Sequence, residues 1–307
     1  TTVLVAGTNG KGSTAGYLWQ LSSLAGLKTG LFTSPHLFSL CERFQCTDEN
    51  IDILLIKKEY LKLKTLLSSE IWQNLSYFEV LTLIALSLFQ KLSCTLVILE
   101  IGLGGRLDAC NAVEPVASVI TNIDYDHQEY LGDSLEKIAR EKLGITRAHT
   151  PLFWGQSTQE DHATKAMQEY RKEEKNLTFT RNKHFSLSYN EKYVWLKISE
   201  QCKVETFLLP SFLSKKPFFH KENFSLALAT MYWLKQHQKK MNIPKLNLDS
   251  FYSLKPNNLS FTPYSHLGRM QEIFIKNTAK QTTPKTLILD VGHNPAALKK
   301  LKISLRK

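Results

Sequence analysis

Residues 3–14 of the chain read VLVAGTNGKGST. The apolar run Val3–Ala6 predicts a buried strand, and a helical pattern of leucines predicts a helix over Ser13–Ala25. A strand, a glycine turn and a helix N-terminus in this order can hold a nucleotide polyphosphate, because backbone N–H groups and the helix dipole face the anion. Lys11, between two glycines, can reach the β- and γ-phosphates. An ordinary glycine turn after a strand is the alternative, and the position of the lysine makes it the weaker one.

The match to a standard phosphate-binding loop is incomplete. The usual pattern has a glycine, four intervening residues, a Gly-Lys pair and then a serine or threonine. Here Val5 occupies the first position and Gly12 follows Lys11. The hydroxyl group that normally contacts Mg²⁺ must therefore come from Ser13 or from another segment, and we expect an additional oxygen ligand downstream.

Composition narrows the class of protein. At 307 residues the chain is long enough for one large or two moderate domains. Its 43% hydrophobic and 22% charged residues are ordinary for a soluble globular protein. The net charge of +11 suits a polyanionic partner, either a nucleic acid or a small substrate. Because the basic residues are scattered rather than interleaved with aromatic residues, we expect a small anion and no nucleic acid as partner.

Cysteine usage and hydropathy indicate the compartment. The five cysteines follow no zinc-site or disulfide spacing, which indicates a reducing compartment and favours a cytoplasmic location: Cys41, Cys46, Cys94, Cys110 and Cys202. The longest apolar stretch, near Val80–Phe89, is too short to span a bilayer, so we expect no membrane partner. No signal peptide precedes Thr1, but the chain opens directly on a strand, so an upstream segment and a targeting signal both stay open.

Strands and helices alternate over the first half of the chain. Apolar runs without period-two alternation predict strands at Val3–Ala6, Thr29–Phe32, Thr95–Glu100, Val116–Thr121 and Pro151–Trp154. Helical patterns lie at Ser13–Ala25, Ile51–Leu67, Phe78–Lys91, Leu135–Leu143 and Gln159–Lys172. This order predicts an α/β fold, with a mainly parallel sheet covered by helices on both faces.

The remainder of the chain is less regular. Residues Leu177–Leu209 read as short strands, which predicts an antiparallel addition at the edge of the sheet. A helix is expected over Glu222–Lys239, and turn-forming residues predict a linker over 255–284. We therefore expect a domain at 1–254, this linker, and a final unit at 285–307. That unit is too short to bury a core of its own, so either it docks on the first domain or it is the beginning of a truncated second α/β domain, and we expect the latter.

Polar clusters follow the predicted strands, at the edge where parallel sheets bind ligands. Thr33–His36 follows the second strand and offers hydroxyl groups, with a simple Ser-Pro turn as an equally good interpretation. Glu100 ends a buried apolar strand, as does the acid that binds Mg²⁺ in many ATP-hydrolysing enzymes. The glycine loop at 102–108 follows it, and a solvated turn is the alternative there.

A further cluster lies after the strand near 119–121. Asp124, Asp126 and His127 share this strand end, which favours metal ligation or proton transfer over a plain surface role. Glu141 and Lys142 lie on the next predicted helix, and their residue types alone indicate a pair on a solvated helix face.

Taken together, these stretches resemble the folylpolyglutamate synthase/dihydrofolate synthase family, within the Mur-ligase-type ATP-dependent amide ligases. In chain order they are AGTNGKGST, TSPHL with ER downstream, YFEVLT, LEIGLGGRLDACN, ITNIDYDHQEYLG, IAREKLGI, HKENFSLALA, LGRMQ and LILDVGHNP. They run in the family's order from Ala6 to Pro295, which makes the resemblance specific.

The resemblance implies a reaction and a set of ligands. Members of the family use ATP to phosphorylate a folate carboxylate, and the amino group of L-glutamate then attacks the acyl phosphate. The phosphates would be held by Gly7, Thr8, Asn9, Gly10, Lys11, Gly12 and Ser13. Ser34 and Glu100 would bind a first Mg²⁺, and His127 would bind a second. Lys142 matches a lysine that is carbamylated in the family, and a salt-bridging lysine is the alternative.

Other matching positions imply substrate contacts. Positions near the pteroate pocket are matched by Tyr77, Phe78, Glu79, Leu107 and Asp108. Positions that contact ATP or lie at the domain junction are matched by Asn223, Arg269, Asp290 and His293.

The chain also departs from the family. Cys110 stands where threonine is common, Gly292 where alanine is common, and Phe224-Ser225 where smaller residues are usual. The family's segment before the phosphate-binding loop and its full C-terminal domain do not appear in this sequence, so we expect a fragment that can bind ATP and still fail to turn over.

Three alternatives stay open. A Mur-type ligase acting on cell-wall precursors is the nearest, although TSPHL and GLGGRLDA resemble the folate branch. A basic, non-catalytic nucleotide- or nucleic-acid-binding module would bind in a steeply salt-dependent manner, without any dependence on folate. A truncated, inactive paralogue is the third. The preference between folate and dihydropteroate stays open, and we expect a monomer.

Overall fold

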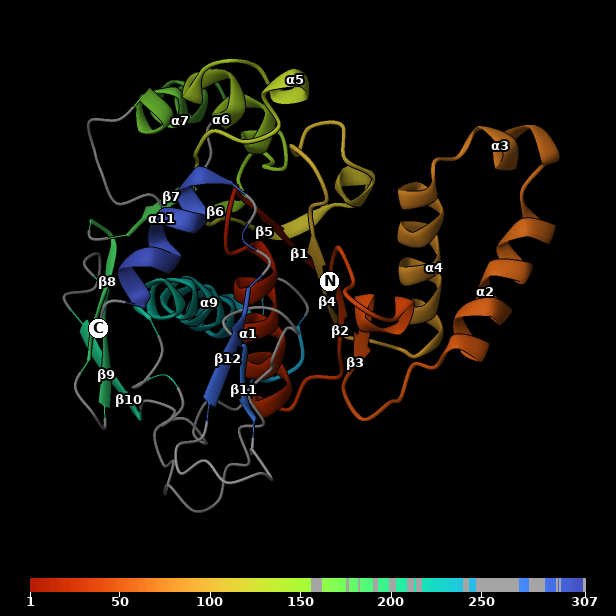
Figure 1. The fold of residues 1–307 in the computed structure, drawn as a ribbon, viewed down its shortest axis with the longest axis horizontal. Helices are drawn as coiled ribbons and strands as arrows, with labels where there is room; N and C mark the ends of the chain where they lie inside the picture. Colours follow the sequence, from red (N-terminus) through yellow and green to blue (C-terminus); the bar gives the residue numbers. More distant parts are fainter. Residues whose placement is uncertain are drawn as a thin grey trace.

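The computed structural model describes residues 1–155, 162–174, 177–181, 183–189, 193–198, 203–208, 213, 217–239, 243–246, 271–275, 285–290, 292 and 294–305. Its centre is a seven-stranded sheet in the order β3-β2-β4-β1-β5-β6-β7 (Figure 1). The strands are β1 (Thr2–Ala6), β2 (Thr29–Phe32), β3 (Phe44–Cys46), β4 (Leu96–Glu100), β5 (Pro115–Ile120), β6 (Pro151–Trp154) and β7 (Leu177–Thr180). All neighbours are parallel except β3, which runs antiparallel to β2 at one edge. The predicted α/β fold with a mainly parallel sheet is confirmed.

Strand β1 lies at the middle of the sheet and separates two hydrophobic cores. Val3 and Val5 belong to one core, and Leu4 and Ala6 belong to the other. Successive side chains of a strand point to opposite faces, so a strand covered on both sides must be apolar at every position. This is why the first strands read as continuous apolar runs rather than alternating ones.

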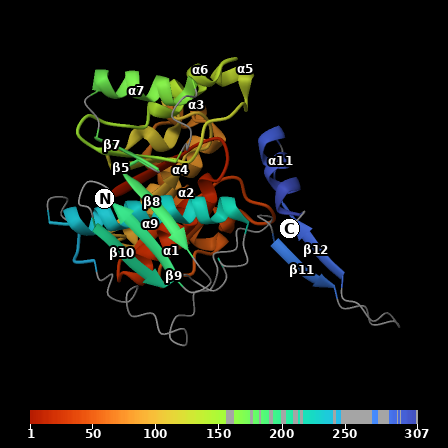
Figure 2. The same cartoon turned by 90° about the vertical axis from the view of Figure 1, so that its left-hand side faces the viewer.

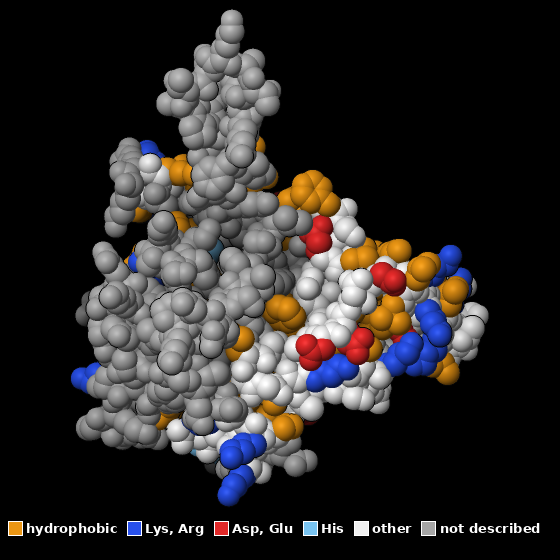
Figure 3. Space-filling view, turned by 90° about the horizontal axis from the view of Figure 1, so that it is seen from below, with side chains coloured by type: hydrophobic (Ala, Val, Ile, Leu, Met, Phe, Trp, Pro, Cys, Tyr) orange, Lys and Arg blue, Asp and Glu red, His pale blue; other side chains and the backbone are white. Residues whose placement is uncertain are grey.

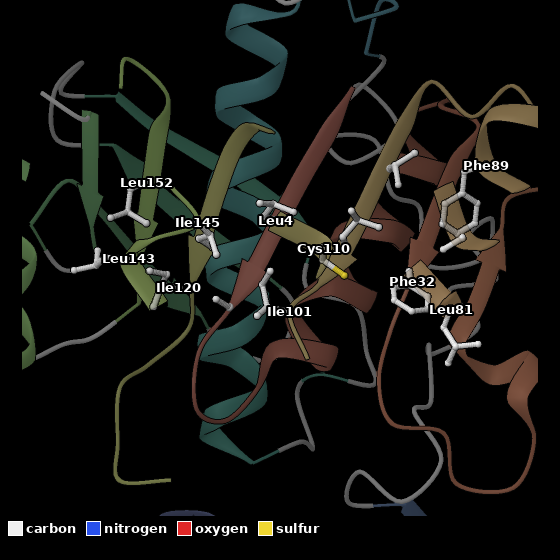
Figure 4. Packing of buried hydrophobic residues seen from close by; sticks show 14 of the residues in the cluster. Leu4, Phe32, Leu81, Phe89, Ile101, Cys110, Ile120, Leu143, Ile145 and Leu152 are labelled. Carbon is white, nitrogen blue, oxygen red and sulfur yellow. The ribbon is translucent and has the colours of Figure 1, made fainter. Parts of the chain in front are cut away.

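Helices cover both faces of the sheet. On one face, α1 (Lys11–Leu24) packs against α9 (Phe218–His237). The other face is covered by α4 (Tyr77–Lys91), α6 (Leu135–Leu143) and α7 (His162–Glu174). Figure 4 looks into this second core, where Leu4, Ile120 and Leu152 lie along the strands.

A lateral extension projects beyond the β3 edge of the sheet (Figure 1). It consists of α2 (Ile53–Leu66), α3 (Ser69–Asn74) and α4, and each helix begins with a side-chain cap from Asp52, Ser68 or Ser76. Ile53, Leu54, Leu61 and Leu66 of α2 are exposed, and hydrophobic side chains lie among basic and acidic ones at the right-hand end of the molecule in Figure 3. The short elements β3 and α3 were not predicted, because three to six residues carry too little periodicity.

The predicted antiparallel addition over Leu177–Leu209 is wrong in its placement. Strand β7 joins the main sheet in parallel with β6, because the crossover helix α7 returns the chain in the same direction. The next strands, β8 (Phe185–Tyr189), β9 (Tyr193–Ile198) and β10 (Lys203–Leu208), form a separate three-stranded antiparallel sheet. The antiparallel edge strand of the main sheet is β3, at the opposite edge.

The C-terminal unit lies beside the main body (Figure 2). Strands β11 (Gln271–Ile275) and β12 (Lys285–Leu289) pair in antiparallel fashion, and α11 (Pro295–Ser304) follows. Part of the predicted linker at 255–284 is therefore the strand β11. In the described ranges, no helix is long and apolar enough to cross a bilayer.

Candidate active site

The glycine turn between β1 and α1 has a backbone that only glycine can adopt at two positions. Gly7 has φ = 142° and Gly10 has φ = 84°, both in the region that L-residues rarely occupy. A Cβ at Gly10 would lie 2.6 Å from Oδ1 of Asn223, and a Cβ at Gly7 would overlap the hydroxyl of Thr121. Two neighbouring segments therefore pack directly against the loop backbone.

The end of β5 holds the loop in place. Asn122 accepts the Thr8 N–H at its carbonyl oxygen and the Asn9 N–H at its Oδ1, each at 2.9 Å. The Thr121 hydroxyl donates to the Asn9 carbonyl oxygen at 2.6 Å. The loop then enters the first turn of α1, where helix N–H groups and the dipole favour an anion.

Two lysines converge on one carbonyl of the loop. The Lys11 Nζ donates to the Gly7 and Thr8 carbonyl oxygens at 2.9 and 3.1 Å, and the Lys142 Nζ donates to the Gly7 carbonyl oxygen at 3.1 Å. Burial, together with the charge of Lys11, lowers the pKa of Lys142 to about 7, although Asp126 and Asp108 oppose the shift. Near neutral pH an appreciable share of Lys142 is therefore the uncharged amine.

Lys142 is only 4% exposed, so the interpretation of Glu141 and Lys142 as a solvated pair is wrong for the lysine. Glu141 instead pairs with Arg106 at 2.9 Å in a partly exposed ion pair. The spacing of Lys142 from Ile138, four residues earlier, could have placed it on the buried face of α6.

Glu100 and Ser34 meet at the carboxyl ends of adjacent strands. Glu100 ends β4, is 2% exposed, and accepts the Ser34 N–H at 2.9 Å. In the register of the sheet Glu100 pairs with Val5, so the carboxylate lies next to the beginning of the glycine loop. The buried Arg43 guanidinium interacts with the Glu100 charge, and burial lowers the pKa of Arg43. A buried carboxylate with a serine beside it is an oxygen donor set that suits Mg²⁺.

In the part of the chain that the structure describes, no group of three or more His, Cys, Asp or Glu residues could hold a metal ion. A metal at the Glu100–Ser34 edge would therefore need oxygen ligands of other kinds, such as a serine hydroxyl and nucleotide phosphates.

The Asp124–His127 segment lies against the loop from the other side. The Thr8 hydroxyl donates to the Asp124 carbonyl oxygen at 3.1 Å and accepts the Asp124 N–H at 3.0 Å. His127 has φ = 46°, precedes the short helix α5 (Gln128–Leu131), and its N–H donates to Asp126 Oδ1 at 3.1 Å. The imidazole is about half exposed, with Nε2 3.8 Å from Asp126 Oδ1. Within this segment, the charge of the Asp126 carboxylate raises the pKa of Lys142.

The residues matched to the pteroate pocket fall into two groups. Glu79 and Asp108 accept backbone N–H groups: Glu79 forms a capping box with Ser76, and Asp108 bonds three N–H groups of the loop at 102–110. Their side chains thus have local structural roles, and contact with a substrate stays a prediction. Tyr77 is 62% and Leu107 is 80% exposed, so both are available to a ligand.

Phe78 connects these two predicted segments. Its ring lies 5.8 Å from that of Phe32 between centroids, and a Cβ at Gly102 would lie 2.8 Å from its Cζ. The N-terminus of α4 and the glycine loop after β4 are therefore packed together.

Two cavities flank Asn223. The larger, of about 360 Å³, is lined by residues that include Asn9, Thr121 and the ion pair Arg181–Glu222, whose atoms approach to 2.7 Å. The smaller is lined by residues that include Ser13 and Asp290. The loop, α9 and the C-terminal unit thus meet around Asn223. The predicted residues Arg269 and His293 lie outside the described residues.

Asn294 was not predicted as a site residue. Its Oδ1 caps α11 by accepting the Ala297 N–H at 2.9 Å, and its Nδ2 donates to Asn9 Oδ1 at 3.1 Å and Asp126 Oδ2 at 3.3 Å. It is 4% exposed and connects the C-terminal unit to the loop. The Asn-Pro pair at 294–295 signals a helix cap, but no local pattern indicates a contact 285 residues away.

Known proteins share this arrangement. The dihydrofolate synthase/folylpolyglutamate synthase of Haemophilus influenzae is 31% identical over 312 residues, covering 97% of this chain and 63% of the relative. The folylpolyglutamate synthase of Arabidopsis thaliana is 42% identical over 172 residues, covering 54% of this chain and 29% of the relative. The chain thus spans less than two thirds of the length of these relatives.

Solved structures match over nearly the whole chain. A bifunctional folylpolyglutamate synthase/dihydrofolate synthase with Mn, AMPPNP and L-glutamate bound gives a TM-score of 0.77 at 29% identity, covering 100% of this chain and 66% of that one. Escherichia coli FolC in complex with DHPP and ADP gives 0.78 at 28% identity, covering 99% and 65%. The sequence profile of the Mur ligase middle domain matches residues 5–213. This chain belongs to the Mur ligase middle domain family.

Proposed function

We propose that this protein is an ATP-dependent ligase that joins L-glutamate to a folate or to dihydropteroate. The observation that carries the proposal is the meeting of Lys11, Lys142 and the buried Glu100 around one glycine loop at the carboxyl edge of the sheet. A cationic loop beside a buried acid suits a metal-bound nucleotide. One similar solved structure holds Mn, AMPPNP and L-glutamate and another holds DHPP and ADP, which supports the same classes of ligand here.

The reaction needs activation because a carboxylate and an ammonium group do not condense in water. Transfer of the γ-phosphoryl group of ATP to the substrate carboxylate gives an acyl phosphate, and the amino group of glutamate then displaces phosphate. Lys11 and the first turn of α1 would neutralise the charge on the β- and γ-phosphates. For this the Lys11 ammonium must leave the Gly7 and Thr8 carbonyl oxygens that it occupies.

We propose two positions for divalent cations. Ser34 and Glu100 would hold a first Mg²⁺, because the two residues adjoin and Glu100 is buried beside the loop. His127 and Lys142 would hold a second. A bound Mg²⁺ would supply charge neutralisation of the phosphates.

Lys142 could ligate a cation only as a carbamate. Its lowered pKa, about 7, favours the neutral amine that attacks CO₂, and the product would replace a cation by an anionic oxygen donor. The carbamate carbon could be detected by nuclear magnetic resonance with ¹³C-labelled bicarbonate, and the Lys142→Met variant should lack that signal.

The substrate would lie between the N-terminus of α4 and the loop at 102–108. Exposed Tyr77 and Leu107 and the half-buried Phe78 offer aromatic and apolar contacts for a pterin ring. The carboxylates of Glu79 and Asp108 would accept hydrogen bonds from the donor groups of the pterin ring and so orient the ring. The adenosine part of ATP would lie near Asn223 and Asp290, with Arg269 and His293 completing the junction.

The decisive experiment measures ADP release with and without glutamate, in the presence of dihydropteroate or tetrahydrofolate. We expect release to require both co-substrates. The Lys11→Ala variant loses phosphate neutralisation and Glu100→Gln loses a metal ligand, so each should reduce release at least 100-fold. Lys57→Ala and Glu114→Gln, at exposed positions, are matched controls and should behave like the wild type. Equal ADP release in all mixtures would refute the ligase assignment, and full activity of Lys11→Ala would refute the site.

A further inference from the structure

Two cysteines lie side by side at the amino edge of the sheet, away from the glycine loop. The Sγ atoms of Cys46 and Cys94 are 3.4 Å apart, although the residues are 48 positions apart in sequence. Both are free thiols, and the distance exceeds that of a disulfide bond by about 1.3 Å.

The backbone fixes this proximity. The segment after Cys46 is anchored by the Thr47 N–H, which donates to the Thr29 carbonyl oxygen at 3.0 Å, and the segment after Cys94 by the Thr95 N–H, which donates to the Lys28 carbonyl oxygen at 2.8 Å. Both segments are therefore anchored to the first residues of β2. These backbone hydrogen bonds to neighbouring residues of one segment hold the two cysteine side chains next to each other.

The surroundings favour a thiolate on one of the two sulfurs. A hydrogen bond from Cys94 and the nearby Lys28 ammonium lower the pKa of Cys46, although burial opposes them, and the same hydrogen bond raises the pKa of Cys94. Cys46 is 6% exposed, which limits attack to a small reagent, whereas Cys94 is partly exposed. A thiolate with a thiol donating to it is the arrangement of a reactive and a resolving cysteine.

We propose that Cys46 and Cys94 form a redox-responsive thiol pair that a peroxide converts reversibly to a disulfide. The Cys46 thiolate attacks one peroxide oxygen, the O–O bond breaks, and hydroxide leaves to become water, which gives a sulfenic acid. The Cys94 sulfur then attacks the Cys46 sulfur, its proton goes to the departing hydroxide, and a second water leaves. In total, two thiols lose two electrons and hydrogen peroxide gains them, yielding one disulfide and two waters.

The bond would close the chain segment that contains α2, α3 and α4. A link across 48 positions restricts the unfolded chain, so the oxidised protein should melt about 5–10 °C higher than the reduced protein. Glu100 lies at the opposite end of β4 from Cys94, and the strand itself, Leu96–Glu100, is about 13 Å long. Oxidation of the pair uses none of the side chains assigned to the ligase reaction proposed above.

The test treats the whole protein with hydrogen peroxide, stops the reaction in acid, unfolds the chain, blocks free thiols by alkylation and maps the peptides. We expect a linked peptide that contains Cys46 and Cys94, its loss after treatment with dithiothreitol, and the rise in melting temperature. Cys41→Ser is the matched control, because Cys41 is another partly exposed free thiol in the same region, and it should behave like the wild type. Recovery of both Cys46 and Cys94 as free thiols while Cys41 is oxidised would overturn the proposal.

Single variants test the order of reaction. In Cys94→Ser the sulfenic acid of Cys46 should persist and react with dimedone when the protein is unfolded in the presence of that reagent. In Cys46→Ser, labelling of Cys94 should be at least several-fold lower, and equal labelling of the two variants would overturn the assignment of Cys46 as the reactive residue. The mapping of the wild type does not depend on the folding of either variant, and thermal unfolding of the reduced forms verifies that both are folded.

Discussion

Lys142 is the single residue whose environment differs most from that of an ordinary lysine. It is 4% exposed and contacts the Gly7 carbonyl oxygen of the phosphate-binding loop at 3.1 Å. Removal from water disfavours its charged form, and Lys11, which contacts the same carbonyl oxygen, adds repulsion. A lysine whose pKa is lowered by burial makes the stability of the folded state depend on pH.

We therefore predict a change with pH in the free energy of unfolding that is caused by Lys142. Its folded pKa of about 7 lies below the ordinary lysine value, so between pH 7 and about 10 the unfolded chain binds this proton and the folded chain does not. The free energy of unfolding should rise with pH over that interval, by about 3–5 kcal/mol relative to Lys142→Met, in which the titrating group is absent.

Urea unfolding at a series of pH values measures this difference. Lys62→Met, which alters an exposed lysine, serves as the matched control and should keep the pH dependence of the wild type. A wild type and a Lys142→Met variant with parallel pH profiles would show that the lysine titrates alike in the folded and unfolded chains.

At the scale of one element, the turn between β1 and α1 depends on glycine for two separate reasons. Gly10 has a left-handed backbone, and Asn223 of α9 leaves no room for a Cβ. Gly26, at the end of α1, has a similar φ of 88° but has nothing within 4 Å of the position of a Cβ. Comparison of the two positions separates backbone strain from the steric conflict.

We predict that Gly10→Ala is clearly more destabilising than Gly26→Ala. The Gly26→Ala change should cost about 1 kcal/mol from the left-handed backbone alone. Gly10→Ala should cost about 1–3 kcal/mol more and weaken nucleotide binding at least 10-fold, because the Asn223 side chain or the loop must shift to make room for the Cβ. Chemical unfolding and titration with a fluorescent ATP analogue measure both effects. Equal losses of stability in the two variants would mean that the contact between position 10 and Asn223 does not contribute to the free energy of unfolding.

How far the sequence predicts the elements depends on their length and burial. Strands β2 and β6 and helix α6 have the predicted bounds, because each is a distinct apolar or amphipathic run between turn signals. The pairing of β7 and the separate sheet of β8–β10 depend on contacts between distant segments, which local patterns do not encode. At the site, the glycine turn and the acid at the end of β4 were predictable from residue type, whereas the burial of Lys142 was obscured by its charged neighbour.

At the scale of the whole molecule, hydrogen bonds link the C-terminal unit to the glycine loop between β1 and α1. Asn294 provides a direct connection, since it caps α11 and donates from Nδ2 to Asn9 and Asp126. Asn9 belongs to the loop, and the charge of Asp126 acts on Lys142. A ligand that rearranges the loop would therefore also alter the seating of α11.

Replacement of Asn294 by aspartate separates this connection from helix capping. Aspartate caps helices as well as asparagine does, so α11 should stay folded. The variant lacks the Nδ2 donor, however, and places a carboxylate oxygen against Asp126 Oδ2, which lies 3.3 Å from the side chain of Asn294, whereas the Asn9 amide can still donate to the new side chain. Repulsion should undock α11, accelerate amide hydrogen exchange in 295–304 about 10-fold or more, and weaken binding of the ATP analogue several-fold. Lys299→Glu, an exposed change in the middle of the same helix, controls for added negative charge. Hydrogen exchange of Asn294→Asp that matches the wild type would mean that α11 is held by its other contacts, and the connection through Asn294 would then carry no coupling between the C-terminal unit and the nucleotide.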